Sequence, residues 1–581
     1  MKVNILPGCV LAASLALTTS CSDFLTEDPK GQLTTETLFK TSSDLEKAVY
    51  NLYSFVQGFQ CNSNPMIVQT MGDDVTSTTG SNKAAYLAAD AFQSPTDLKG
   101  VNDLWSFYYN LIKASNFIID VANHMNVDKS ELSEQLGQAY FWRAYAYYGL
   151  VRTWGPVPMS PETVLNVDTK NNTDDIPTSS VEEIYNYIVN DLKAAEECNL
   201  PEKYSGANKT VGGANIYVSS QAVKSALTAV YMSMAGFPLN KTEYYALAAD
   251  KAKEVIDAVN ARGIQSLLPD WNDVYNYGNN YSSECILGIY YNPNYGSWGW
   301  DDSTLSSCHV LQYYDSWQGW GDFIPERYFW LNYPAGPRKD AVYCKTLPTK
   351  SGNNVDWWAT KDGEPYNADA KNAVITDYRP MFTPFAANMD DTDKPLKEKF
   401  DCTKPFYKGM CLDKSHQLIR YSEVLCWFAE ASARAHKYNS EAREALKKVR
   451  ARAWSDQNAI NAVAGMSDDE LAEAAYNEHR YEVAGNVLAM VTCREDEFRM
   501  NKLHDAFNYR TGAQAAVLVP KGTVTHSEDA SGNAFTYTLK QDVVLKEEMQ
   551  VEGTWKGSES MYSVYPPTEV ERNSYLKNVS R

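Results

Sequence analysis

The sequence predicts a mostly α-helical protein in which helices form hairpin pairs and one long irregular segment is inserted among them. Apolar residues recur at three- and four-residue steps over several long stretches, as they do on the buried face of a helix. Helix-starting and helix-stopping residues bound these stretches. Residues 264–415 lack this period and are rich in Gly, Pro, Asn and Tyr, so we expect loops with short strands or helices there.

The composition is that of a large globular protein. The 581 residues are 44% hydrophobic and 22% charged, which is enough for a large core. The net charge is -20 and Lys and Arg do not cluster, so nucleic acid is not an expected partner. The eleven cysteines include no C-x-x-C pair and no metal-ligand spacing with histidine, and we interpret them as mostly buried thiols.

The first 20 residues predict a lipoprotein signal peptide. Lys2 precedes an apolar core at 10–17 that is too short to span a membrane, and small residues precede Cys21. We expect cleavage before Cys21 and acylation of its thiol; a plain secretory signal cut near Ser20 is the alternative. No later segment has 18 consecutive apolar residues, so the lipid would be the only membrane attachment.

The helix that organises the chain lies within residues 138–158, QAYFWRAYAYYGLVRTWGPVP. Its apolar positions share one face, and we expect Arg143 on that face to be paired or to cap a carbonyl. Gly155 and the two prolines after it stop the helix.

The other helices follow in chain order. Ser43 is expected to cap the first, and Ser180 with Glu183 forms a capping box that opens the fourth. A second capping box, Ser467 with Glu470, opens a helix that runs to about 485. The expected ranges of the remaining helices are 102–124, 220–235, 244–262, a helix from Leu418, and 441–453.

Several stretches resemble the RagB/SusD family of surface lipoproteins. The 138–158 stretch is similar to the signature helix of the family, and CSDFLTEDPKGQLT from Cys21 onward is similar to its mature N-terminus. IRYSEVLCWFAEASARA and VYPPTEVERNSYLKN resemble two later blocks. Glu478, Arg480 and Glu482 match an ERRxELAGE-type motif in which His479 replaces the usual arginine. At least seven such blocks occur in order, although 486–500 lacks a good copy of the corresponding block.

The resemblance implies a fold, a location and a partner. The fold would be SusD-like, with tetratricopeptide-like helical hairpins and an inserted irregular loop-rich lobe. Residues 21–581 would form one domain, with a helical frame at 36–263 and 416–510 and the ligand lobe at 264–415. The protein would be held in the outer membrane by a lipid on Cys21, facing the exterior. It would capture oligosaccharides or polysaccharides for import by a SusC-like TonB-dependent transporter.

Aromatic residues in the irregular lobe are the main ligand candidates. Sugar rings have apolar C–H faces and hydroxyl rims, so flat aromatic side chains beside Asn, Asp and Gln suit them. The family also places ligand residues in the loop after the first helix, which here offers Asp74, Lys83 and Tyr86. A turn role for Asp73 remains open. The candidate ligand residues are Trp298, Trp300, Trp317, Trp320, Tyr295, Asp73 and Asn82.

The sequence contains none of the common catalytic motifs. H-E-x-x-H, G-x-S-x-G, the P-loop and G-x-G-x-x-G are all missing, so we expect no enzyme, no catalytic metal and no cofactor, with a structural Ca²⁺ left open. Two alternatives to glycan capture remain. One is capture of peptides or glycoproteins by the same kind of complex. The other is a surface glycoside hydrolase, which needs two carboxylates facing each other across a groove.

Overall fold

The fold is taken from a computed structural model. It describes residues 38–60, 71–77, 84–93, 99–160, 175–275, 279–291, 323–344, 346–348, 414–512, 516–528, 533–547 and 553–581, together with five short strands between 354 and 382. The described part is mostly helical, as the sequence predicts.

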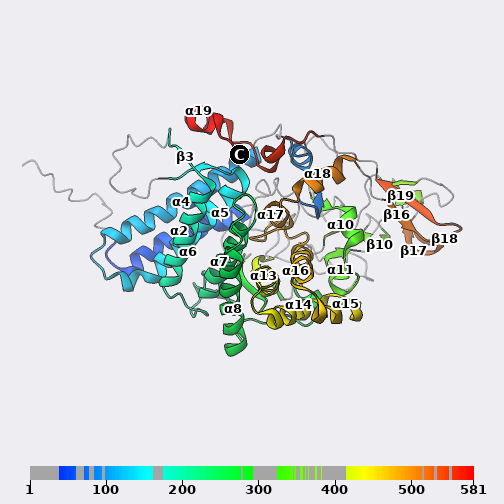
Figure 1. The fold of residues 1–581 in the computed structure, drawn as a ribbon, viewed down its shortest axis with the longest axis horizontal. Helices are drawn as coiled ribbons and strands as arrows, with labels where there is room; N and C mark the ends of the chain where they lie inside the picture. The colour runs from blue at the N-terminus through cyan, green and yellow to red at the C-terminus, as the bar shows by residue number, and fades with distance from the viewer. Residues whose placement is uncertain are drawn as a thin grey trace, which may run out of the picture.

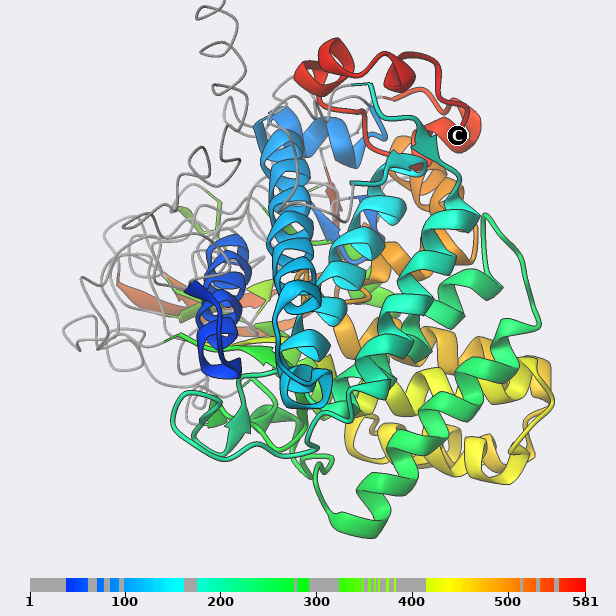
Figure 2. The ribbon, with the colours of Figure 1, turned by 90° about the vertical axis from the view of Figure 1, so that its left-hand side faces the viewer.

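The long helices form the frame of the molecule. Each packs on the next along the chain, and α8 then packs on α13, which in turn contacts α14 and α16. Figure 2 shows this row running from α2 in blue to the yellow helices. The bounds are α2 (Ser42–Gln60), α4 (Lys99–His124), α5 (Ser133–Trp154), α6 (Val181–Glu197), α7 (Ser220–Ala235), α8 (Tyr244–Arg262), α13 (Tyr421–Arg434), α14 (Asn439–Ala453) and α16 (Asp468–Val483).

Helix ends are set by local hydrogen bonds. At the start of α6 the Glu183 N–H donates to Ser180 Oγ at 3.2 Å, and the Ser180 N–H donates to Glu183 Oε2 at 2.8 Å. Both predicted capping boxes are therefore confirmed, since Ser467 and Glu470 form the same pair at α16. The predicted cap of α2 is wrong. The helix begins at Ser42, and Thr41 Oγ1 accepts from the Asp44 N–H at 3.3 Å.

The organising helix α5 packs closely on its neighbours. Arg143, predicted to be paired, donates to both carboxylate oxygens of Asp191 at 2.8 and 2.7 Å and to Asn116 Oδ1 at 2.8 Å. A side chain at Gly149 would lie 2.1 Å from the Tyr108 ring, so this glycine allows α4 and α5 to approach each other. Gly155 then ends α5 with φ of 76°.

The helix predicted from Leu418 starts later than expected. Residues His416–Arg420 form strand β15, which pairs antiparallel with β6 (Cys285–Ile289), and α13 begins at Tyr421. All five residues of β15 are buried. The pairing partner lies over a hundred residues away, so the local helical period gave the wrong element for residues 418–420.

Shorter elements complete the fold. They include two antiparallel pairs, β1 (Val75–Thr76) with β7 (Ile324–Pro325) and β2 (Val157–Pro158) with β3 (Thr178–Ser179). The short helices are α3 (Ala84–Asp90), α10 (Arg327–Asn332), α11 (Pro337–Val342), α15 (Gln457–Ala462), α17 (Cys493–Arg499), α18 (Leu503–Gly512) and α19 (Pro567–Arg572), with 3-10 turns η3 (Lys129–Leu132), η4 (Trp271–Asp273), η6 (Val463–Gly465), η7 (Gly557–Met561) and η8 (Ser574–Asn578).

A small group of strands lies at the end of the molecule away from α2 (Figure 1). The sequence analysis assigned no element to residues 516–547, where most of these strands fall. The strand bounds are β13 (Ala373–Ile375), β16 (Ala516–Val519), β17 (Gly522–Glu528), β18 (Ala534–Leu539) and β19 (Val543–Glu547). The remaining short strands are β4 (Thr210–Val211), β5 (Ala214–Asn215), β8 (Tyr343–Cys344), β9 (Thr346–Pro348), β10 (Asn354–Asp356), β11 (Thr360–Lys361), β12 (Glu364–Pro365) and β14 (Met381–Phe382). Of these, β10 and β12 contact β17.

The described residues form two hydrophobic cores. The first core lies between the frame helices and includes Trp142, Trp154 and Trp427. The second core is smaller and joins short segments from distant parts of the chain: residues 71–75, 85–92, 271–274, 323–343, 382, 453, 483–507 and 561–562. The second core therefore lies where the irregular segment meets the frame.

Candidate functional site

Most of the predicted ligand residues fall outside the part of the chain that the structure describes. Trp298, Trp300, Trp317, Trp320, Tyr295 and Asn82 lie outside the described residues, as does Cys21. Of the candidate residues only Asp73 is described. The structure does describe residues 71–77 and 84–93 of the loop after the first helix, and the residues from 323 onward that follow the tryptophan-rich segment.

These two parts of the chain lie side by side. The first-helix loop, which we define as the described residues 71–77 and 84–93, contains β1, and β1 pairs with β7 just after the tryptophan-rich segment. Val75 is opposite Pro325 and Thr76 is opposite Ile324. The ring of Tyr86 meets that of Phe323 edge to face at 5.1 Å between centroids. The loop therefore contacts residues 323–325, and Tyr86, which the loop offered to a ligand, is buried in this contact.

Asp73 lies in an ion-pair cluster. Its carboxylate lies 3.0 Å from the guanidinium of Arg480, and 35% of the side chain is exposed. The Asp73 N–H donates to Glu497 Oε2 at 3.1 Å. Burial raises the pKa of Glu497 well above its usual value and Asp73 raises it further, while Arg480 opposes the change. The same Arg480 nitrogen lies 2.7 Å from Glu497, so one cation serves both acids.

Asp74 connects the first-helix loop to two other segments through hydrogen bonds. Its carboxylate is buried and accepts from the Gly485 N–H at 2.9 Å, and its carbonyl accepts from the Glu326 N–H at 2.9 Å. Burial raises the pKa of Asp74, and the hydrogen bond from Gly485 opposes that rise. Asp74 thus ties the first-helix loop to both α16 and α10.

A cavity opens behind the first-helix loop. Its volume is about 480 Å³, and its walls come from the loop, the start of α4 and the C-terminal segment. Phe92 and Tyr562 supply rings, and Gln93, Glu559 and Arg581 supply polar groups. Phe92 also packs on Trp555 at 5.4 Å between centroids. This mixture of rings and polar groups is typical of a small-ligand site.

The sequence analysis missed Phe92, which lines the cavity, and Trp555, which packs on it. Trp555 falls in a stretch to which it assigned no element, and Phe92 carries no marker beyond its place in the first-helix loop. Phe92 has φ of 55°, a conformation rare for a residue with a bulky side chain, which only the structure reveals.

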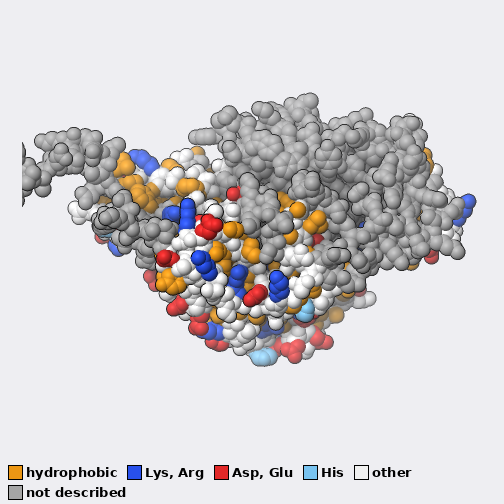
Figure 3. Space-filling view, turned by 90° about the horizontal axis from the view of Figure 1, so that it is seen from above, with side chains coloured by type: hydrophobic (Ala, Val, Ile, Leu, Met, Phe, Trp, Pro, Cys, Tyr) orange, Lys and Arg blue, Asp and Glu red, His pale blue; other side chains and the backbone are white. Residues whose placement is uncertain are grey.

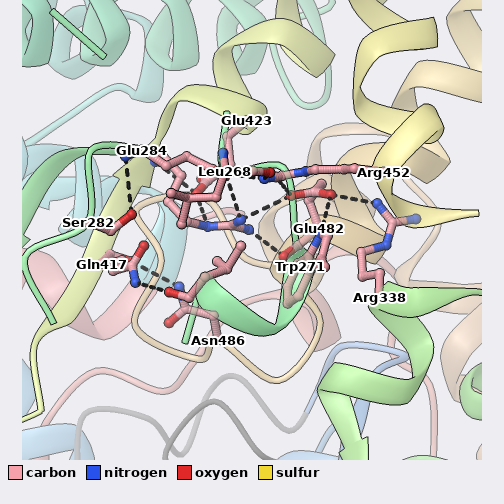
Figure 4. Close-up of polar contacts among 12 residues, drawn as sticks. Leu268, Trp271, Ser282, Glu284, Arg338, Gln417, Glu423, Arg452, Glu482 and Asn486 are labelled. Atoms are coloured by element: carbon pink, nitrogen blue, oxygen red, sulfur yellow. Dashed lines mark hydrogen bonds and ion pairs between the residues drawn. The ribbon is translucent and has the colours of Figure 1, made fainter. Parts of the chain in front are cut away.

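Buried ion pairs hold the irregular segment against the frame. Four arginines and four glutamates take part, so their formal charges balance. Figure 4 shows the centre of this arrangement, with Arg338, Arg452 and Trp271 pointing toward Glu482. We call it the arginine network and define it as Arg338, Arg420, Arg450, Arg452, Glu284, Glu423, Glu478 and Glu482.

Glu482 is the centre of the arginine network. Its carboxylate lies 2.7 Å from Arg338, 3.0 Å from Arg420 and 3.3 Å from Arg452. It also accepts from Trp271 Nε1 at 3.1 Å. Burial alone would raise the pKa of Glu482, but the guanidiniums of Arg452, Arg338 and Arg420 lower it below its usual value. The carboxylate is therefore charged and fully engaged.

Glu284 and Glu478 extend the network in two directions. Glu284 accepts from Arg452 at 2.5 and 2.7 Å and from the Leu268 N–H at 3.0 Å. Glu478 lies 2.8 Å from both Arg338 and Arg450. Both carboxylates are fully buried, and a buried charge is stable only when it is paired. The network thus joins α11 and the residue before β6 to β15, α13, α14 and α16, and Trp271 adds η4.

The exposed surface carries a mixture of charged and apolar side chains. On the part of the upper face formed by described residues, acidic and basic side chains are interspersed with apolar ones (Figure 3). No group of three or more His, Cys, Asp or Glu among the described residues is placed to hold a metal ion. None of the described helices is both long and apolar enough to cross a membrane.

Comparison with solved structures identifies the class of fold. The chain is similar to a SusD homolog from Bacteroides thetaiotaomicron, with a TM-score of 0.65 at 18% identity, covering 82% of this chain and 90% of the other. It is also similar to a surface glycan-binding protein A from the same species in complex with laminarihexaose, with a TM-score of 0.61 at 17% identity and coverage of 92% and 98%. The fold is SusD-like.

Sequence comparison agrees with the fold. A family model described as starch-binding associating with outer membrane matches residues 23–232, and a model described as SusD family matches 271–487. The SusD-like protein P2 of Formosa agariphila is 24% identical over 479 residues, which cover 80% of this chain and 85% of that protein. The chain belongs to the SusD/RagB family.

Proposed function

We propose that this protein is a cell-surface glycan-binding lipoprotein. It is attached to the outer membrane by a lipid on Cys21 and faces the exterior. It captures oligosaccharides or polysaccharides and passes them to a SusC-like TonB-dependent transporter for import. Binding rests on stacking and hydrogen bonds, with no cofactor and no covalent chemistry.

The pairing of β1 with β7 is the observation that carries the proposal. It brings the first-helix loop to the end of the segment that contains Trp317 and Trp320. The first-helix loop therefore pairs with the residues that directly follow the predicted ligand segment, which supports a shared site for the two regions. Related folds support the ligand class, since one similar protein was crystallised with laminarihexaose and another with a xylogluco-oligosaccharide.

Peptide or glycoprotein capture is the first alternative. Charged walls around the site would favour it. The charged groups near the first-helix loop mostly pair with each other: Arg480 with Asp73 and Glu497, and Asp74 with a backbone N–H. The cavity beside them combines rings with neutral and charged groups. This pattern favours a glycan because few charges are left for a charged peptide.

A glycoside hydrolase is the second alternative. It would use one carboxyl group with a raised pKa as the acid and a second carboxylate across a groove. Glu497 has a raised pKa, but it is buried at 1% exposure and accepts hydrogen bonds from Asp73 and Arg480. A substrate would have no access to it. Its geometry favours a structural role.

Calorimetric titration tests the proposed function. Residues 22–581 would be titrated with a panel of oligosaccharides, and again with Trp298, Trp300, Trp317 and Trp320 each changed to Ala. We expect binding without release of product, and loss of affinity in at least one variant. Binding to no glycan, or affinity unchanged in all four variants, would contradict the predicted site and favour peptides. Cleaved sugar in the calorimeter sample after the titration would support the hydrolase instead.

A further inference from the structure

An exposed tyrosine, Tyr328, packs on the half-buried Tyr509 beside the candidate site. Tyr328 of α10 and Tyr509 of α18 have ring centroids 4.6 Å apart, with 32° between the ring planes. Tyr328 is 52% exposed, more than any other aromatic among the large exposed residues that the structure describes. Within the described residues its hydroxyl forms no hydrogen bond. We call Tyr328 and Tyr509 the tyrosine platform.

The platform is held rigidly. The α10 helix starts directly after β7, and its N-cap Glu326 receives the Phe329 N–H on Oε2 at 3.1 Å. Phe329, one residue after Tyr328, is buried in the second core and lies under the guanidinium of Arg480 at 5.3 Å. The backbone of Tyr328 is therefore fixed while its ring remains in solvent. A ring presented in this way binds without losing much conformational entropy.

The platform lies within reach of the predicted ligand residues. It follows β7, which pairs with the first-helix loop. Trp320, outside the described residues, precedes Tyr328 by eight positions, and eight residues of extended chain span at most about 29 Å. Because the separation has this upper limit, a glycan chain of several units bound at Trp320 would be long enough to reach the platform as well.

We propose that the tyrosine platform is a second stacking site for sugar rings, which extends the glycan site and makes the protein prefer longer chains. The inference rests on the proposed function and adds chain length to it. The exposed ring of Tyr328 stacks on the C–H face of a sugar, and its hydroxyl is available to the sugar hydroxyls. Asn332, whose amide donates to the Tyr328 carbonyl at 2.9 Å, and Asn508 are exposed polar neighbours in the chain.

A sugar fits the platform better than a protein does. Stable protein interfaces bury on the order of 800 Å² on each partner and centre on large apolar anchors. The only other large exposed apolar side chain on α10, among its described residues, is Leu331 at 38% exposure. Two tyrosine rings, one leucine and amide groups match the area and the mixed chemistry of a short run of sugar units.

The test compares glycan chain lengths in matched variants. Wild type, Tyr328→Ala, Tyr509→Ala and Tyr328→Phe would be titrated with laminaribiose, laminarihexaose and laminarin, or with the same size series of whichever panel glycan the wild type binds. Tyr575→Ala is the control, because Tyr575 is 50% exposed but lies on η8. We expect the alanine changes at the platform to weaken binding of the long chains roughly threefold to tenfold and to leave the shortest ligand unchanged. The phenylalanine variant should keep most of the affinity.

The outcomes separate this inference from the proposed function. If wild type binds glycan and Tyr328→Ala binds every chain length equally well, the platform is overturned and the proposed function stands. If wild type binds no glycan in the panel, both fail. If Tyr328→Ala retains glycan binding but no longer co-purifies with the transporter, the platform is a protein contact and the inference is wrong. Thermal unfolding of each variant shows whether the fold is kept.

Discussion

The two hydrophobic cores of this protein are held together in different ways. The first core joins long helices that follow one another in the chain, and its interior is mostly apolar. The second core joins short segments from distant parts of the chain and is bordered by the arginine network and by the cluster around Asp73. One hydrogen bond beside the second core, from Gly485 to Asp74, closes a loop of 411 residues.

The difference shows what each region requires of the sequence. A frame of amphipathic helices needs apolar residues in a period, and many substitutions satisfy that need. A region with buried charges needs a specific partner for each charge, because an unpaired buried charge is costly. The candidate site is built on the second region, so we expect its geometry to be more sensitive to single changes than the frame.

The largest effect is expected from Glu482→Gln. The neutral amide keeps the size of the side chain but leaves Arg338, Arg420 and Arg452 without their common carboxylate. Breaking one partner of a buried ion pair costs about 3–5 kcal/mol. Urea unfolding followed by circular dichroism would measure this loss of stability.

Glu473→Gln is the matched control for that change. Glu473 lies on the same helix, α16, and its side chain is 51% exposed and lies 2.9 Å from Lys502. An exposed pair of this kind contributes about 0–1 kcal/mol. If both variants lost the same small amount, the arginine network would not stabilise the fold as argued.

Sequence reasoning worked well for the frame because its signals are local. The predicted ranges of α7 and α8 agree with the structure, and Gly263 ends α8 in the left-handed conformation with φ of 61°. Both capping boxes were found from residues three positions apart. Local hydrogen bonds and one apolar face decide these elements, and both can be read from a short window.

The second region could not be predicted in the same way. Glu478 and Glu482 were recognised as motif residues, but their partners Arg338 and Arg452 lie in other segments, and no local pattern links them. The last three residues of strand β15 were predicted as helix because β6, the partner of this strand, lies far away in the chain. One signal was available. Charged residues repeated on the buried faces of α13 and α16 indicate a polar network in an otherwise apolar interior.

His479 provides a pH-dependent test at the boundary of the two regions. It is fully buried, its ring packs on Trp427 of the first core, and it lies 2.5 Å from Asp496. Burial alone would lower the pKa of His479, but Asp496 and Glu423 raise it to about 9 from the ordinary 6.5. Its contribution to stability is therefore complete below pH 6.5 and is lost as the pH rises through 9.

The comparison of His479→Asn with wild type isolates this contribution. We expect the variant to be less stable than wild type by on the order of 3 kcal/mol at pH 6, with the difference shrinking as the pH passes 9. Urea unfolding of both proteins across this pH range measures it. A difference that does not change with pH would mean that the imidazole is neutral and that the effect comes from packing alone.

The smallest effects are expected at the two capping serines. The same capping box occurs once in the helical frame and once in the region around the second core. Ser180 begins α6 in the frame, and Ser467 begins α16, the helix that carries Glu478 and Glu482. Each serine accepts one backbone N–H, so Ser180→Ala and Ser467→Ala should each cost about 1 kcal/mol. Urea unfolding of both variants tests whether helix ends act locally. If Ser467→Ala costs clearly more than Ser180→Ala, the first turn of α16 is coupled to the arginine network more than ten residues further along the helix. The start of α16 and the arginine network would then unfold cooperatively, although no hydrogen bond or ion pair among the described residues joins them.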